Sequence, residues 1–177
     1  MRVSTLALND GHNVPWMAFG TGSVFYYKDV TKAVTTAIRN GFTHLDGGQV
    51  YLNEETLGAG IIASGKPRSE LYITTKFTPS VPASETPKSA LEKSLKKLRV
   101  TYVDLYLIHN PDNHVGKLKE VWKGMEETKK AGLARSIGVS NFTVDHLEEI
   151  LQVATIIPAV NQVGNDFLSV AIELSLN

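Results

Sequence analysis

The sequence contains no cysteine among its 177 residues. This excludes a disulfide scaffold, a thiol nucleophile and a cysteine-ligated metal site, and it fits a reducing compartment. An excess of charge of one sign is also lacking, because 18 basic and 18 acidic side chains cancel. Nucleic-acid binders usually have a basic face, so we expect no nucleic-acid partner.

Long apolar runs are absent as well. No stretch reaches the roughly 20 apolar residues that a membrane-spanning helix needs, so no membrane association is expected. The segment Met1–Asp10 turns polar after Arg2 and lacks the apolar region of a secretory signal. The sequence therefore predicts a cytoplasmic protein, and its 42% hydrophobic content suits one ordinary globular core.

Segments typical of strands and of helices alternate along the chain. Apolar, β-branched runs predict six strands, at Met17–Gly22, Phe42–Asp46, Leu71–Phe77, Tyr102–Ile108, Ser136–Ser140 and Ala159–Val163. Between them, apolar residues at helical spacing predict amphipathic helices, as at Leu91, Leu95 and Leu98. Strands that alternate with helices in this way indicate βαβ units and a parallel sheet, which is an α/β fold.

Two segments lie outside this alternation. Asp10-Gly11 is a tight-turn signal, so Leu6–Pro15 predicts an N-terminal β-hairpin. In Phe167–Leu176, apolar residues alternate with small or polar ones, which favours an extra strand. A helix remains an alternative there, because no turn signal precedes this segment.

Several short motifs lack an essential part. Gly60–Lys66 nearly matches a P-loop, but Pro67 replaces the hydroxyl that would bind Mg²⁺, so this stretch is expected to end a helix. Gly20-Thr-Gly22 lacks the third glycine of the dinucleotide-binding fingerprint. His109 and His114 have no third ligand at a useful spacing, so no metal site is expected.

Polar residues stand at the carboxyl ends of the predicted strands, where α/β proteins place their chemistry. They are Asp46, Tyr51, Lys76, His109, Ser140, Asn141 and Gln162. Because the carboxyl ends of parallel strands meet at one edge of a sheet, we expect these side chains to face a common mouth.

Four of these residues form a set suited to carbonyl reduction. A tyrosine has an ordinary pKa near 10, too high for an effective acid at neutral pH. Lys76 is expected to lower the pKa of Tyr51 by stabilising the phenolate. Asp46 is expected to keep Lys76 charged. A neutral His109 can donate a hydrogen bond to a carbonyl oxygen.

Each of the four also has a structural explanation. Asp46 is equally well explained as a helix cap or an ion-pair partner, and Lys76 as half of a buried ion pair. His109 is explained as a hydrogen-bonded histidine at a strand end, and Tyr51 as a packed aromatic ring. Their joint appearance, in this order along the chain, favours the catalytic interpretation.

The chain resembles the aldo-keto reductase family over about residues 6–163. The segments that carry the resemblance are Gly41–Asp46 with Tyr51–Glu54, Leu105–Pro111, Ile137–Phe142 and Asn161–Val163. The resemblance implies a (β/α)8 TIM-barrel type of fold, of which this chain would supply about six of the eight strands. It also implies a C-terminally truncated member, with a partial barrel over residues 1–163 and a divergent tail over 164–177.

The resemblance further implies a function. The reaction would be the NADPH-dependent reduction of an aldehyde or ketone to an alcohol, with a small carbonyl compound as substrate. Tyr51 would be the proton donor, Lys76 and Asp46 would tune it, and His109 would orient the carbonyl group. The residues that the resemblance implies at the cofactor are Thr21, Gly22, Ser140, Asn141 and Gln162.

Departures from the family pattern open an alternative. Gly47-Gly48 replaces the usual Thr/Ser-Ala, which is expected to loosen the loop that carries Tyr51. The family's last two βα units, which hold the adenosine phosphates, have no counterpart here. The alternative is therefore a catalytically silent partial barrel that serves as an interaction module or is a non-functional fragment. An open sheet has two unpaired edges, so a homodimer through the open side is also expected.

Overall fold

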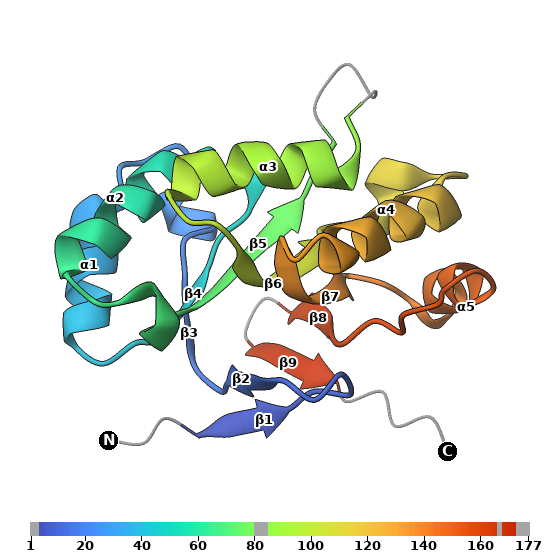
Figure 1. Cartoon of the computed structure of the whole chain (residues 1–177), viewed down its shortest axis with the longest axis horizontal. Coiled ribbons are helices and arrows are strands. Elements are labelled where there is room, and N and C mark those ends of the chain that lie inside the picture. The colour runs from blue at the N-terminus through green and yellow to red at the C-terminus, as the bar shows by residue number, and fades with distance from the viewer. Residues whose placement is uncertain (1–3, 80–84, 166–167, 173–177) are drawn as a thin grey trace.

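In the computed structural model, which describes residues 4–79, 85–165 and 168–172, a curved sheet packs against a row of helices (Figure 1). The sheet has seven strands in the order β3-β4-β5-β6-β7-β8-β9. A separate two-stranded hairpin lies near one end of it (Figure 1). The strands follow one another across the sheet as they do along the chain, which is the arrangement that repeated βαβ units produce.

The first six strands of the sheet run parallel to one another. They are β3 (Ala18–Gly20), β4 (His44–Asp46), β5 (Tyr72–Phe77), β6 (Val103–Ile108), β7 (Ala134–Ser140) and β8 (Asn161–Asn165). Each coincides with a predicted strand to within two residues at either end. The parallel sheet confirms the predicted α/β class and the incomplete barrel.

In the described ranges, five α-helices connect the parallel strands. They are α1 (Thr31–Arg39), α2 (Glu54–Ser64), α3 (Pro87–Leu98), α4 (Leu118–Lys130) and α5 (Val144–Leu151). Thr86 and Thr143 cap α3 and α5 by accepting hydrogen bonds from backbone N–H groups of the first turn. Gly65 ends α2 with a φ of 73°, so the near P-loop is a helix terminus, as predicted.

The N-terminal hairpin consists of β1 (Thr5–Ala7) and β2 (Asn13–Pro15) and confirms the predicted turn. Its turn is fixed to the amino-terminal side of the sheet. There Asp10 pairs with Lys129 at 2.5 Å, and the Asn9 amide donates to the carbonyl of Pro158 at 2.9 Å. The hairpin thus closes the end of the sheet opposite to the strands' carboxyl ends.

The seventh strand, β9 (Leu168–Ile172), runs antiparallel to β8 and falls within the tail for which an extra strand was predicted. It occupies one edge of the sheet and β3 occupies the other. Residues 166–167 and 173–177 of the tail lie outside the described part of the chain.

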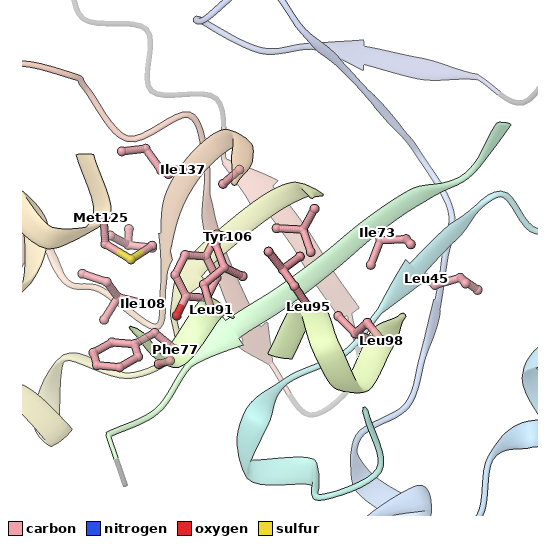
Figure 2. Close-up of a cluster of buried hydrophobic side chains, with 14 of the residues drawn as sticks. Leu45, Ile73, Phe77, Leu91, Leu95, Leu98, Tyr106, Ile108, Met125 and Ile137 are labelled. Carbon is pink, nitrogen blue, oxygen red and sulfur yellow. The ribbon is translucent and has the colours of Figure 1, made fainter. Parts of the chain in front are cut away.

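The main core lies between the sheet and the helices (Figure 2). Strand residues such as Leu45, Ile73 and Phe77 pack there with residues of α3 and with Met125 of α4 (Figure 2). Full burial of one such side chain contributes roughly 1.5–3 kcal/mol. Because side chains alternate along a strand, packing of Phe77 on the helices turns Lys76 to the inner, concave face of the sheet.

None of the helices in the described part of the chain is long and apolar enough to cross a membrane.

Candidate active site

Lys76 lies at the centre of the candidate site, on the inner face of β5. Lys76 is 2% exposed, and its Nζ donates hydrogen bonds to Asp46, to the Gly47 carbonyl at 2.9 Å and to the Tyr51 hydroxyl at 3.2 Å. Asp46 ends the neighbouring strand β4, so parallel pairing of the two strands brings the two charges together. The structure therefore joins three of the four residues that the sequence singled out.

Asp46 and Lys76 hold each other in their charged forms. Burial by itself raises the pKa of Asp46, but the charge and hydrogen bond of Lys76 outweigh it, and the pKa lies below its ordinary value. Burial by itself lowers the pKa of Lys76, but Asp46 and Tyr51 together outweigh it, and the pKa lies above its ordinary value. A lysine that is charged at neutral pH thus faces the hydroxyl of Tyr51.

The ring of Tyr51 is enclosed on two sides by glycines. It lies in a short 3₁₀ turn, η2 (Gln49–Tyr51), and a Cβ atom added at Gly22 or Gly48 would come within 3.0 Å and 3.1 Å of its ring. Tyr26 packs edge-on against the ring, with centroids 5.0 Å apart. The absence of a side chain at Gly48 therefore leaves space for the Tyr51 ring. The loop was expected to be loosened by Gly47-Gly48, but the ring of Tyr51 is closely packed.

The pKa of Tyr51 differs from the expectation. Burial raises the pKa of the hydroxyl, and the opposing effect of Lys76 is smaller, so the pKa lies above its ordinary value of 10.0. Asp46 raises the pKa further through its negative charge. In this chain Lys76 limits the rise and does not produce a net lowering, because the hydroxyl is buried among the residues that hold it.

His109, directly after β6, faces Tyr51 from the other side. The two rings meet edge to face, with centroids 5.5 Å apart. Burial, together with the charge of Lys76, lowers the pKa of His109 to about 4, so its imidazole is neutral at neutral pH. Its Nδ1 lies 3.1 Å from the hydroxyl oxygen of Thr78.

Ser140, Asn141 and Gln162 lie beside these four residues. Gln162 donates to Asp46 at 3.0 Å, and Ser140 donates to the backbone carbonyl of Gln162 at 2.7 Å. The amide of Asn141 donates to the backbone carbonyl of His109 at 2.9 Å. The structure thus gathers all three at the same mouth of the sheet.

Thr21 lies below the mouth and is fully buried. Its hydroxyl and its backbone N–H both donate to the carbonyl of Asp46, at 3.1 Å and 2.9 Å. Thr21 therefore fixes the strand end that presents Asp46. The adjacent Gly22 contributes through the absence of a side chain, because the Tyr51 ring occupies that space.

Two residues of the site carried no motif signal in the sequence. The Thr78 hydroxyl contacts His109, and the Gln49 side chain accepts a hydrogen bond from the Thr78 backbone N–H at 2.9 Å. Thr78 directly follows β5, so inspection of every polar residue at a strand end would have found it. Gln49 lies in the loop before Tyr51, and its contacts follow from tertiary packing.

The donor set at the mouth fits a nicotinamide cofactor. A carboxamide group needs both hydrogen-bond donors and acceptors, and Ser140, Asn141 and Gln162 offer hydroxyl and amide groups of both kinds. The Oε1 atom of Gln162 carries no hydrogen bond to the described residues, since only its Nε2 is engaged, by Asp46.

Comparisons with known proteins agree with this architecture. The model of the aldo/keto reductase family matches residues 16–175. Glyoxal reductase of Bacillus subtilis is 45% identical over 159 residues, which are 90% of this chain and 57% of that protein. The chain therefore spans about half the length of the curated relatives it matches.

Two solved structures are similar in fold and sequence. The aldo/keto reductase of Brucella melitensis has a TM-score of 0.84 and 35% identity, covering 93% of this chain and 63% of that one. The Bombyx mori aldo-keto reductase in complex with NADP has a TM-score of 0.82 and 37% identity, covering 93% and 59%. The fold, the order of the site residues along it and the family match lead to one conclusion: the chain belongs to the aldo/keto reductase family.

Proposed function

We propose that the chain catalyses the NADPH-dependent reduction of an aldehyde or ketone to an alcohol, with Tyr51 as the proton donor. The observation that carries the proposal is the position of Lys76 Nζ, which contacts Asp46 and lies 3.2 Å from the Tyr51 hydroxyl. The relative named as a glyoxal reductase and the NADP-bound family structure support the reaction class and the cofactor.

The chemistry that a bound nicotinamide supplies is hydride transfer to the carbonyl carbon. The carbonyl oxygen gains negative charge in this step, and Tyr51 delivers its proton there. Lys76 stabilises the phenolate that remains, because its charge lies within hydrogen-bond distance of the oxygen. Asp46 keeps Lys76 protonated and prevents it from moving away from Tyr51.

His109 orients the substrate in this proposal. Its pKa of about 4 keeps the ring neutral, so one ring nitrogen carries a hydrogen that it can donate to the carbonyl oxygen. Ser140, Asn141 and Gln162 hold the carboxamide of the nicotinamide ring. Thr21 and Gly22 shape the mouth, the first by fixing Asp46 and the second by leaving room for Tyr51.

A second copy of the chain is the partner that we propose at the open side of the sheet. The outer edges of β3 and β9 have no strand beside them among the described residues. Two copies related by a two-fold axis can cover both pairs of edges, and a net charge of zero adds no repulsion between them. Trp16 and Met17, directly before β3, are 66% and 59% exposed and supply apolar area at this edge.

The test is an NADPH fluorescence titration of the purified chain, followed by NADPH consumption with glyoxal as substrate. We expect saturable binding, and turnover that the Tyr51→Phe variant reduces by about 100-fold or more, the range that a general acid contributes. Tyr72→Phe is the matched control. Tyr72 is a buried tyrosine of β5 whose hydroxyl has no hydrogen-bond partner in the described part of the chain, so its loss should leave turnover unchanged.

Two results would contradict the proposal. Turnover that survives Tyr51→Phe would show that another group donates the proton. Absence of NADPH binding up to millimolar concentration, in a chain shown to be folded by circular dichroism, would favour the catalytically silent partial barrel instead.

A further inference from the structure

Thr78 connects the catalytic region to a buried network of hydrogen bonds. Its hydroxyl oxygen lies 3.1 Å from Nδ1 of His109, and the backbone N–H of His109 donates to the carbonyl of Phe77 at 3.1 Å. The ends of β5 and β6 are therefore fixed to each other by backbone and side chain at the point where His109 begins to face the mouth. The described residues provide the Thr78 hydroxyl with no other hydrogen-bond partner.

The position of Thr78 is fixed in turn by Gln49. The backbone N–H of Thr78 donates to Oε1 of Gln49 at 2.9 Å, and Nε2 of Gln49 donates to the Ser94 hydroxyl at 3.1 Å. Ser94, on α3, then donates to Glu54 at 3.1 Å. The backbone N–H of Thr78 needs an acceptor, so Oε1 of Gln49 must face it and Nε2 must face Ser94. The Ser94 hydroxyl, which accepts from Gln49, then donates its own hydrogen to the Glu54 carboxylate.

The network holds the backbone of Thr78, and the hydrogens of the Thr78–His109 contact follow from the partners present: among the described residues, one arrangement satisfies both groups. A hydroxyl that accepted a hydrogen from Nδ1 would have no acceptor for its own proton among the described residues. A hydroxyl that donates to the lone pair of Nδ1 satisfies both groups, and the ring hydrogen then resides on Nε2. That is the nitrogen left to hydrogen-bond a substrate.

We propose that Thr78 is a positioning residue that holds His109 in the tautomer with hydrogen on Nε2, which makes His109 a hydrogen-bond donor toward the carbonyl oxygen. The catalytic consequence rests on the function proposed above. The tautomer itself does not, because it is a property of the chain alone.

Long-range ¹H–¹⁵N correlation spectra of the ¹⁵N-labelled chain at pH 7 test the proposal without cofactor or substrate. We expect a pyridine-type Nδ1 and a pyrrole-type Nε2 for His109, assigned by their loss in His109→Gln. Thr78→Val keeps the shape of the side chain but removes the hydroxyl, and should produce a mixture of tautomers. Thr78→Ser, which retains the hydroxyl, should keep the original tautomer.

Turnover supplies a second readout. Thr78→Val should lower kcat by about 10-fold or more, the scale on which loss of an orienting partner affects a functional histidine, and Thr78→Ser should restore it. A pyrrole-type Nδ1 in the unmodified chain, or a Thr78→Val spectrum identical to it, would overturn the proposal. If the chain shows the expected tautomers but no turnover, the assignment of Thr78 stands and the proposed activity fails.

Discussion

Gln162 donates a hydrogen bond to Asp46 at 3.0 Å, although the two residues are 116 positions apart and lie on strands separated by β5, β6 and β7. The curvature of the sheet brings β4 and β8 within reach of each other across the mouth. This contact adds a second support to the carboxylate that holds Lys76. It makes the geometry of the site dependent on the shape of the whole sheet.

The first prediction concerns this contact. Gln162→Leu removes the donor to a buried carboxylate, so we expect a loss of about 1.5–3 kcal/mol in the free energy of unfolding, measured with urea. Gln152→Leu is the matched control. Gln152 is exposed, and among the described residues its side chain is hydrogen-bonded to Lys119 alone, so its replacement should change stability by less than about 0.5 kcal/mol. Equal effects of the two variants would argue against a structural role for the contact.

The second prediction concerns the buried ion pair. Lys76→Met leaves the Asp46 carboxylate without its partner in a buried place, and should lower the free energy of unfolding by about 3–5 kcal/mol. The double variant with Asp46→Asn should recover much of that loss, because no isolated charge remains. Lys66→Met, which breaks the exposed pair with Glu70, should cost at most about 1 kcal/mol. A double variant less stable than Lys76→Met would contradict this account.

The third prediction is a pH dependence carried by His109. Its pKa is lowered to about 4 from an ordinary 6.5, so between these values the unfolded chain binds more protons than the folded one. The free energy of unfolding should therefore fall as the pH drops from about 6.5 toward 4. The decrease should be smaller in His109→Gln. His44 and His114, whose pKa values are also lowered by burial, are present in both proteins and cancel in the comparison.

The measurement is a series of urea denaturation curves at pH 7, 6 and 5 for both proteins. Curves that shift in parallel would mean that His109 takes up its proton in the folded chain as easily as in the unfolded one.

The fourth prediction concerns the proposed dimer. Sedimentation equilibrium should give a mass that rises with concentration toward twice that of one chain. Met17→Lys places a charge at the β3 edge and should shift the equilibrium toward the monomer. Ile62→Lys adds the same charge at an exposed apolar position on α2 and should not. A single mass equal to one chain at all concentrations would exclude this partner.

Much of the fold could be predicted from the sequence, because parallel strands that are buried on both faces are rich in apolar, aromatic and β-branched residues. Leu71–Phe77 and Tyr102–Ile108 are examples, and each differs from the observed strand by one residue. The strand predicted at Ala159–Val163 is displaced by two, since its bounds depend on pairing with β7, where Asn161 lies opposite Val139. No local pattern encodes that register.

The candidate site, like the fold, could be predicted from the sequence only in part. Asp46, Lys76 and His109 were identifiable because they lie at the carboxyl ends of strands, and these ends share one edge of a parallel sheet. The direction of the Tyr51 pKa shift was wrong, because it depends on how deeply the hydroxyl is buried, which the sequence does not reveal. Thr78 and Gln49 were missed because their importance lies in contacts with each other and with distant residues.

The two tryptophans occupy opposite environments. Trp122 is fully buried on α4, and its indole N–H donates to the carbonyl of Ile156 at 3.1 Å, while Trp16 is 66% exposed at the β3 edge. The chain thus carries two intrinsic optical reporters. Emission from Trp122 follows the packing of α4 on the sheet, and quenching of Trp16 by a dissolved agent follows coverage of the open edge. Folding and assembly can therefore be observed separately in one unlabelled sample.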